Sequence, residues 1–272
     1  MKRILLAFQF LTIIPVKEMK DVSEKEIGGA SIFFPLTGFV QGVLFVVSAG
    51  LFLKIFPPEL ANGLLILVIV ATSGGLHLDG LADTFDAIAL RGDREKKLLV
   101  MKDSTIGPVG VIAIVLALLL KFLALNSLFH YSLFTFYYSL FLMPVFSRWV
   151  MVTAIFHGKS ARQDGIGKIF IENTKLKELV IATLLVIGCW LLVTIFFLSS
   201  LFTIYPGLAQ RSGAGYSLFL VSIPVLYIFS LVSVWFCNKK FGGMTGDTFG
   251  AVSEISEILF LIISVIIRNS SI

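Results

Sequence analysis

The stretch that decides the fold is His77-Leu78-Asp79-Gly80-Leu81-Ala82-Asp83-Thr84-Phe85-Asp86. It ends an apolar segment that is long enough to enter a membrane. Asp79, Asp83 and Asp86 share one face of a helix, because they lie four and seven residues apart. A carboxylate near hydrocarbon costs ~2.5–3.5 kcal/mol on insertion scales, and like charges on one face repel. The pattern therefore indicates a divalent metal ion between them.

The composition places the chain in a lipid bilayer. Of its 272 residues 57% are hydrophobic and only 14% are charged, whereas soluble domains average roughly 25% charged residues. The net charge of +5 fits basic loops at a membrane surface better than a nucleic-acid partner. We expect one integral-membrane domain over residues 1–272 and no binding of nucleic acid.

The apolar segments predict an all-α fold, a polytopic transmembrane helix bundle of about seven segments (six to seven). They cover residues 32–53, 61–82, 108–128, 132–156, 179–202, 216–237 and 247–267. The earlier stretch Ile4–Val16 is too short to span comfortably. We expect it to form an interfacial or re-entrant helix.

The basic residues predict the orientation of the bundle. Of the 22 Lys and Arg residues, 17 lie in the segments 1–30, 86–107, 157–177 and 238–246, and only Lys54, Arg211 and Arg268 lie in the segments that would face the opposite side. Cytoplasmic loops carry an excess of Lys and Arg. We therefore expect a multi-pass protein of the cell membrane, either the plasma membrane or an inner membrane, with a cytoplasmic N-terminus. The acidic motifs then meet at the cytoplasmic face.

Two loop motifs contain candidate phosphate-binding groups. In Met101-Lys102-Asp103-Ser104-Thr105-Ile106-Gly107-Pro108, the proline fits the first turn of a helix, and the amides of a helix N-terminus form a good anion site. An ordinary capped helix start is the alternative. In Arg162-Gln163-Asp164-Gly165-Ile166-Gly167-Lys168, two cations beside two glycines suit a phosphate, and a basic cytoplasmic loop is an equally good account.

The last apolar segment carries an acidic stripe, since Asp247, Glu254 and Glu257 fall on nearly one helix face. If Asp247 shares a metal ion with Asp83, the ends of the second and seventh segments must pack together. Arg148 lies within the fourth segment and needs an acidic partner or a substrate phosphate. Lys121 lies within the third, and we interpret it as a structural residue whose long side chain snorkels towards an interface.

Taken together, the motifs resemble one known family. The residues that carry the resemblance are His77–Thr84, Met101–Ser104 with Ile106-Gly107, and Gly243–Thr248 with Gly250-Ala251. Phe10–Val16 and Phe34–Gly38 add to it. In this order the motifs are similar to those of adenosylcobinamide-GDP ribazoletransferase, or cobalamin synthase. The resemblance covers nearly the whole chain.

The resemblance implies a Mg²⁺-dependent transferase late in cobalamin biosynthesis. Such an enzyme joins adenosylcobinamide-GDP to α-ribazole or α-ribazole 5′-phosphate and releases GMP. The product is adenosylcobalamin or its 5′-phosphate. The sequence leaves open which ribazole form is used and whether the chain forms a homo-oligomer.

We assign candidate roles on this basis. The expected Mg²⁺ ligands are Asp79, Asp83 and Asp247, with Asp86 and Glu254 in support. The expected catalytic residues are Asp103, which positions or deprotonates the attacking hydroxyl, together with Asp83 and Lys102. The expected substrate-binding residues are His77, Ser104, Arg148, Arg162 and Lys168.

Two other functions fit parts of the pattern. A CDP-alcohol-phosphotransferase-like enzyme also holds acids on membrane helices, but its signature requires Asp-Gly-x-x-Ala-Arg, whereas Asp79-Gly80 is followed by Leu81-Ala82-Asp83. An ion-coupled transporter would place its acids near the membrane midplane in paired broken helices. The clustering of acids at one face argues against it.

Overall fold

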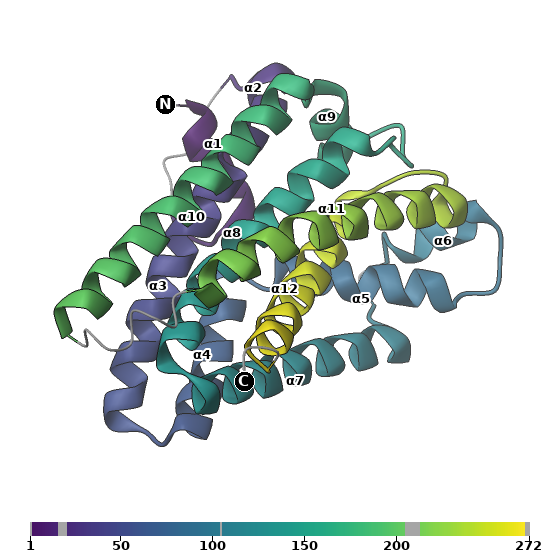
Figure 1. Ribbon diagram of the computed structural model, residues 1–272. Coiled ribbons are helices and arrows are strands. Elements are labelled where there is room, and N and C mark those ends of the chain that lie inside the picture. Colours follow the sequence, from purple (N-terminus) through teal and green to yellow (C-terminus); the bar gives the residue numbers. More distant parts are fainter. Residues whose placement is uncertain (1, 16–20, 104, 205–212, 270–272) are drawn as a thin grey trace.

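The computed structural model describes residues 2–15, 21–103, 105–204 and 213–269. Within these residues the regular structure is helical, and the single β-bridge joins Ser160 to Met244. By length and hydropathy, six helical stretches among the described residues could cross a membrane. The number is seven if the bent pair Pro58–Ser73 and Leu76–Ala89 forms one further span. The predicted all-α polytopic bundle is therefore confirmed (Figure 1).

The helices follow one another along the chain with short connections. The long ones are α3 (Phe34–Ile55), α4 (Pro58–Ser73), α7 (Pro108–Tyr131), α8 (Leu133–His157), α10 (Leu176–Ile204), α11 (Gly213–Phe241) and α12 (Gly246–Asn269). The short ones are α1 (Lys2–Leu11), α2 (Glu24–Gly29), the 3-10 turn η1 (Ala30–Phe33), α5 (Leu76–Ala89), α6 (Arg94–Val100) and α9 (Ile166–Asn173).

Helix α8 is the centre of the bundle. Within its apolar window 94% of the residues are buried, and it packs against α3, α7, α10, α11 and α12. Glycines allow the closest of these contacts: a Cβ on Gly38 would lie 2.5 Å from the carbonyl oxygen of Pro144, and one on Gly42 would meet the backbone of Phe141. Small residues of this kind bring helix backbones together in membranes.

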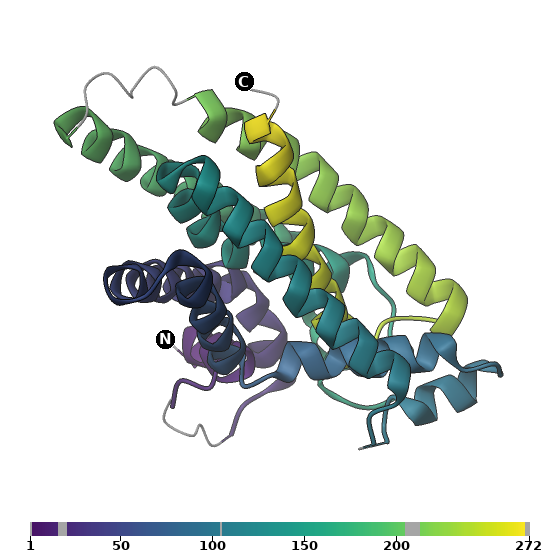
Figure 2. The same cartoon turned by 90° about the horizontal axis from the view of Figure 1, so that it is seen from below.

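Side-chain hydrogen bonds between helices stabilise the bundle. In a membrane the hydrophobic effect does not favour contact between helices over contact with lipid. On α8, Thr153 donates to Ser230 of α11 at 2.7 Å and Trp149 donates to Thr183 of α10 at 2.9 Å. Such bonds between membrane helices contribute about 0.6 kcal/mol each on average. Figure 2 shows α12 lying between α7 and α11 on one side of this framework.

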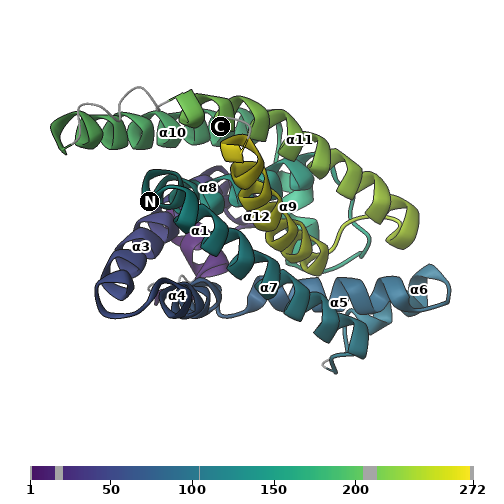
Figure 3. The ribbon, with the colours of Figure 1, turned by 60° about the horizontal axis from the view of Figure 1, so that its bottom comes forward.

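The predicted second segment, residues 61–82, is not one helix. It divides into α4 and α5, which meet at 87°. Gly74 and Gly75 have φ angles of 61° and 76°, a left-handed conformation that glycine adopts without steric cost. The two glycines therefore form a corner, and α5 packs across α7 and α12 and leads into α6 (Figure 3). The acidic motif lies wholly on α5.

The N-terminal segment forms a helix, as expected, although α1 ends at Leu11. Phe10 packs on Phe34 and Phe170, with ring centroids 6.0 and 4.9 Å away. Two residues after the end of α1, Ile13 donates its backbone N–H to the carbonyl of Thr72 at 3.0 Å. This end of the chain is thereby fixed against the C-terminal end of α4, next to the α4–α5 corner.

Candidate active site

Helices α5 and α12 touch at the acidic motif. A Cβ on Gly80 would lie 2.6 Å from the carbonyl oxygen of Asp247, and a Cβ on Gly250 would lie 3.2 Å from the Cα of His77. Gly80 therefore needs to be glycine for this approach, and Gly250 lies in a tight contact. The expectation that the ends of the second and seventh segments pack together is confirmed.

The first turn of α12 is held by its own threonines. The backbone N–H of Thr245 donates to the hydroxyl of Thr248 at 2.8 Å, and the N–H of Thr248 donates to the hydroxyl of Thr245 at 3.2 Å. These bonds occupy backbone donors that a helix start leaves without intrahelical partners. Asp247 lies in this turn, where a negative charge is favourable.

The loop before α12 is joined to the loop after α8. Met244 accepts from the N–H of Ala161 at 2.9 Å and donates to the carbonyl of Lys159 at 2.7 Å. Arg94 of α6 supports the same loop by donating to the carbonyl of Ala161 at 2.7 Å. Two segments about 80 residues apart in sequence thus form one rigid edge.

Arg162 extends from this edge to the acidic motif. Its Nη2 lies 3.1 Å from Oδ2 of Asp247 and also contacts the carbonyl of Leu98 at 3.4 Å. The side chain of Arg162 is about four-fifths buried. The ion pair holds a cation beside a carboxylate, an arrangement suited to binding a phosphate group next to a metal ion.

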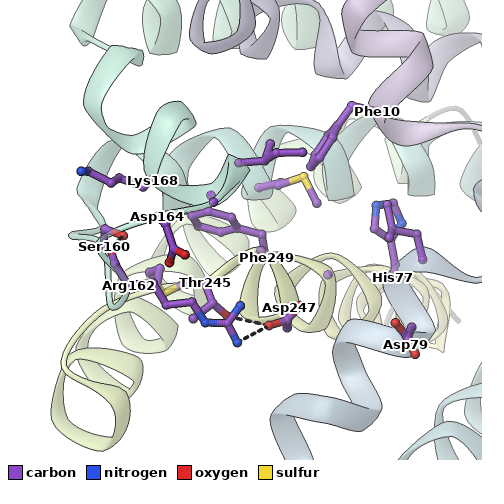
Figure 4. A pocket seen from close by; sticks show the side chains of 18 residues that line it. Phe10, His77, Asp79, Ser160, Arg162, Asp164, Lys168, Thr245, Asp247 and Phe249 are labelled. Carbon is purple, nitrogen blue, oxygen red and sulfur yellow. Dashed lines mark hydrogen bonds and ion pairs between the residues drawn. The ribbon is translucent and has the colours of Figure 1, made fainter. Parts of the chain in front are cut away.

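A cavity of about 250 Å³ opens at this place (Figure 4). Five of the residues that the sequence singled out line it: His77, Asp79, Arg162, Lys168 and Asp247. Other residues of the lining have no role predicted from the sequence, among them Phe10, Ser160, Asp164, Thr245 and Phe249. Ser160, Asp164 and Thr245 lie in or beside the predicted site motifs. Phe10 begins the Phe10–Val16 stretch of the family resemblance, but its place at the cavity depends on tertiary packing.

Asp83 and Asp86 lie on α5 outside this lining. Asp83 is half-buried, and its charge interacts with those of Asp79, Asp86 and Asp247. Asp86 accepts hydrogen bonds from the backbone N–H groups of Gly107 at 2.7 Å and Gly110 at 2.8 Å. It therefore joins α5 to the start of α7, and the helix N-terminus that we expected to bind an anion binds this carboxylate.

The 101–107 loop lies at the edge of the site. Asp103 is exposed, and the pKa of its carboxyl group is lowered by hydrogen bonds from the Thr105 side chain and from the Thr105 backbone N–H, the latter at 3.0 Å. A lowered pKa makes a carboxylate a weaker base. Lys102 lies 3.9 Å from Asp164 at the cavity. Ser104 lies outside the described residues.

Glu254 lies deeper in the bundle, in a buried network. Oε2 of Glu254 and Oε2 of Glu257 lie 2.6 and 2.5 Å from Nζ of Lys121, and Oε1 of Glu257 lies 3.3 Å from Nη1 of Arg148. The exposed fraction of each residue is 4% or less. The interpretation of Lys121 as a snorkelling residue is therefore wrong, because this lysine is buried and forms ion pairs with two acids within the bundle. The expected pairing of Arg148 with an acid is confirmed.

The predicted metal ligands were compared with what Mg²⁺ requires. In the part of the chain that the structure describes, no three His, Cys, Asp or Glu side chains are grouped as a ready metal site. Mg²⁺ typically binds through one or two protein carboxylates, several waters and substrate phosphates. Asp79 and Asp247 lie on facing helices at one cavity and supply oxygen donors of that kind. Metal binding by these residues stays a prediction.

The fold and the cavity define a polytopic membrane protein whose helix bundle holds a cavity lined by acids, cations and apolar side chains. Comparison with known proteins makes this class specific. The model of the family described as cobalamin-5-phosphate synthase matches residues 3–265. The chain belongs to this family and is therefore a membrane-embedded enzyme.

Individual relatives agree with the family match. The chain is 35% identical over 267 residues to the adenosylcobinamide-GDP ribazoletransferase of Thermodesulfovibrio yellowstonii, which covers 96% of this chain and 94% of the relative. It is 37% identical over 257 residues to the protein of the same name from Geotalea daltonii, which covers 94% of each. No solved structure matched the chain.

Proposed function

We propose that this chain transfers the cobinamide phosphate of adenosylcobinamide-GDP to a ribose hydroxyl of α-ribazole or its 5′-phosphate and releases GMP, with Mg²⁺ bound at the cavity. The observation that carries the proposal is the meeting of Asp79, Asp247 and Arg162 on one cavity wall, in a chain whose relatives bear the name of this reaction. The orientation predicted from the basic loops would put this cavity at the cytoplasmic face.

The cavity residues have separate roles in metal binding and phosphate binding. Asp79 and Asp247 would hold Mg²⁺, with Asp83 behind them on α5. When bound, the ion supplies positive charge to the phosphate oxygens. Arg162 and Lys168, which also line the cavity, bind the phosphates and stabilise charge on the leaving GMP.

Four earlier assignments change in this proposal. Asp86 holds the start of α7, Glu254 neutralises Lys121, and Arg148 neutralises Glu257, so we assign these three to the framework. Asp103 is exposed outside the cavity lining and hydrogen-bonded to its own loop, so we no longer assign it the proton transfer. Ser104 is left without an assignment.

GMP release tests the reaction. Purified protein in detergent is given adenosylcobinamide-GDP, α-ribazole and Mg²⁺, and GMP is measured with and without a chelator. We expect activity that needs both substrates, is lost with EDTA and returns with Mg²⁺. Asp79→Asn should lower the rate at least a hundredfold, while Glu95→Gln on the exposed face of α6 serves as the matched control. GMP release that ignores the chelator, or an active Asp79→Asn protein, would refute the metal assignment.

A further inference from the structure

His77 is buried in a way that the framework does not explain. It is 2% exposed, and neither Nδ1 nor Nε2 of its ring has a hydrogen-bond partner among the described residues. A buried polar group without a partner costs roughly 1–3 kcal/mol, and most such groups in native proteins are paired. Since His77 lines the cavity, a ligand there can supply the missing partner.

The surroundings of the ring indicate which kind of ligand. Figure 4 shows the imidazole pointing towards Phe10, with Asp79 pointing away from it and with Arg162 and Lys168 at the other end of the cavity. Leu76 also lines the cavity beside His77. This end is thus apolar and aromatic, with one buried imidazole. It suits a flat apolar ring system that offers few polar atoms.

The size of the cavity narrows the choice further. About 250 Å³ holds a nucleoside but not a corrinoid. Three nucleoside groups take part in the proposed reaction, namely the adenosyl and guanosine groups of the donor and the ribazole. Adenine and guanine each present several donors and acceptors along their edges, which an apolar wall with a single imidazole would leave without partners. A ribazole is a nucleoside of a benzimidazole, whose base has one free ring nitrogen, an acceptor.

We propose that His77 donates a hydrogen bond from its imidazole N–H to the free ring nitrogen of the acceptor's benzimidazole base, and that this end of the cavity selects the acceptor nucleoside. The inference rests on the proposed function and adds the position of one substrate. Phe10 covers the base from α1, and Gly250 allows α12 to lie close to His77. The sugar then points towards the acids and Arg162.

Binding of the acceptor without the donor tests this placement directly. Calorimetry on the purified full chain would use α-ribazole, the matching indole nucleoside that has C–H in place of the ring nitrogen, and GMP. We expect the wild-type protein to bind α-ribazole roughly three- to tenfold more tightly than the indole nucleoside, the effect of one neutral hydrogen bond. His77→Phe should bind both with one weak affinity, and GMP should bind as before.

Stability separates this role from a structural one. If His77 serves a ligand, His77→Phe removes an unpaired polar ring, so the ligand-free protein should melt at the same temperature or higher. A structural histidine would lower the melting temperature when replaced. His77→Gln, which retains a donor, should recover part of the preference for α-ribazole, and His130→Phe on the exposed end of α7 is the matched control.

The remaining outcomes would contradict the hydrogen bond of His77, the placement of the acceptor nucleoside or the proposed function. If the wild-type protein binds both nucleosides equally, or His77→Phe keeps the preference for α-ribazole, the hydrogen bond is refuted while the transferase function stands. If His77→Phe weakens GMP instead, the cavity takes guanine and the placement is wrong. If the wild-type protein shows neither nucleoside binding nor GMP release, the proposed function itself fails.

Discussion

Replacing Lys121 should destabilise the bundle more than any other single change to a basic residue on α7. Lys121 is 1% exposed and pairs with Glu254 and Glu257. In Lys121→Met, Glu257 keeps Arg148 at 3.3 Å, whereas Glu254 loses the one ion pair that the described residues give it. One buried carboxylate is then left uncompensated.

The expected loss in the free energy of unfolding follows from this one uncompensated carboxylate. Removing one partner of a buried ion pair typically costs about 3–5 kcal/mol, which is at least a hundredfold in the folded-to-unfolded ratio. Glu254→Gln should cost less, because Lys121 keeps Glu257. The double variant Lys121→Met with Glu254→Gln should recover about 2 kcal/mol relative to Lys121→Met alone, since no charge is then left unpaired.

Equilibrium unfolding of the purified protein in detergent measures these differences. Lys54→Met, on the exposed C-terminal end of α3, is the matched control and should change stability by less than about 0.5 kcal/mol. A cost below about 1 kcal/mol for Lys121→Met would refute the reasoning. A double variant that is no more stable than Lys121→Met would also refute it, because the unpaired charge of Glu254 would then not cause the loss of stability.

Two further outcomes test the framework around the site. Asp86→Ala should lower stability by about 1–3 kcal/mol through its bonds to the α7 amides, and should leave the Mg²⁺ concentration for half-maximal activity unchanged; a large shift in that concentration would return Asp86 to the metal site. Single cysteines at the exposed positions Asp93 and Lys175, in a protein lacking Cys189 and Cys237, should resist impermeant thiol reagents in intact cells, whereas labelling of both from outside would invert the predicted orientation.

Much of the arrangement follows from local sequence patterns. Apolar length predicts the spanning helices, and the spacing of Asp79, Asp83 and Asp86 places them on one helix. The meeting of α5 with α12 was predicted from charge, because Asp247 needs a cation and few are near. The family resemblance rests on the same residues, and the comparisons confirm it.

The parts that were missed depend on tertiary packing. The α4–α5 corner needs both glycines in a left-handed conformation, and a glycine pair in sequence does not specify a direction of bending. The partners of Glu254 and Asp86 lie 133 and 21 to 24 residues away. Hydropathy alone presented Lys121 as a snorkelling residue, because a charge balance inside a bundle depends on which helices are neighbours.

Helix α12 connects the buried network to the cavity. Its first turn carries Asp247, and its middle carries Glu254 and Glu257, seven and ten residues later on nearly the same face. The ion pairs with Lys121 of α7 and Arg148 of α8 hold these two acids in place. They therefore fix the depth and the rotation of α12 in the bundle. Because Gly80 leaves no space for α12 to approach α5 more closely, the same forces set the position of Asp247 opposite Asp79. A charge network inside the membrane thus stabilises the bundle and also determines the geometry of the two carboxylates at the cavity.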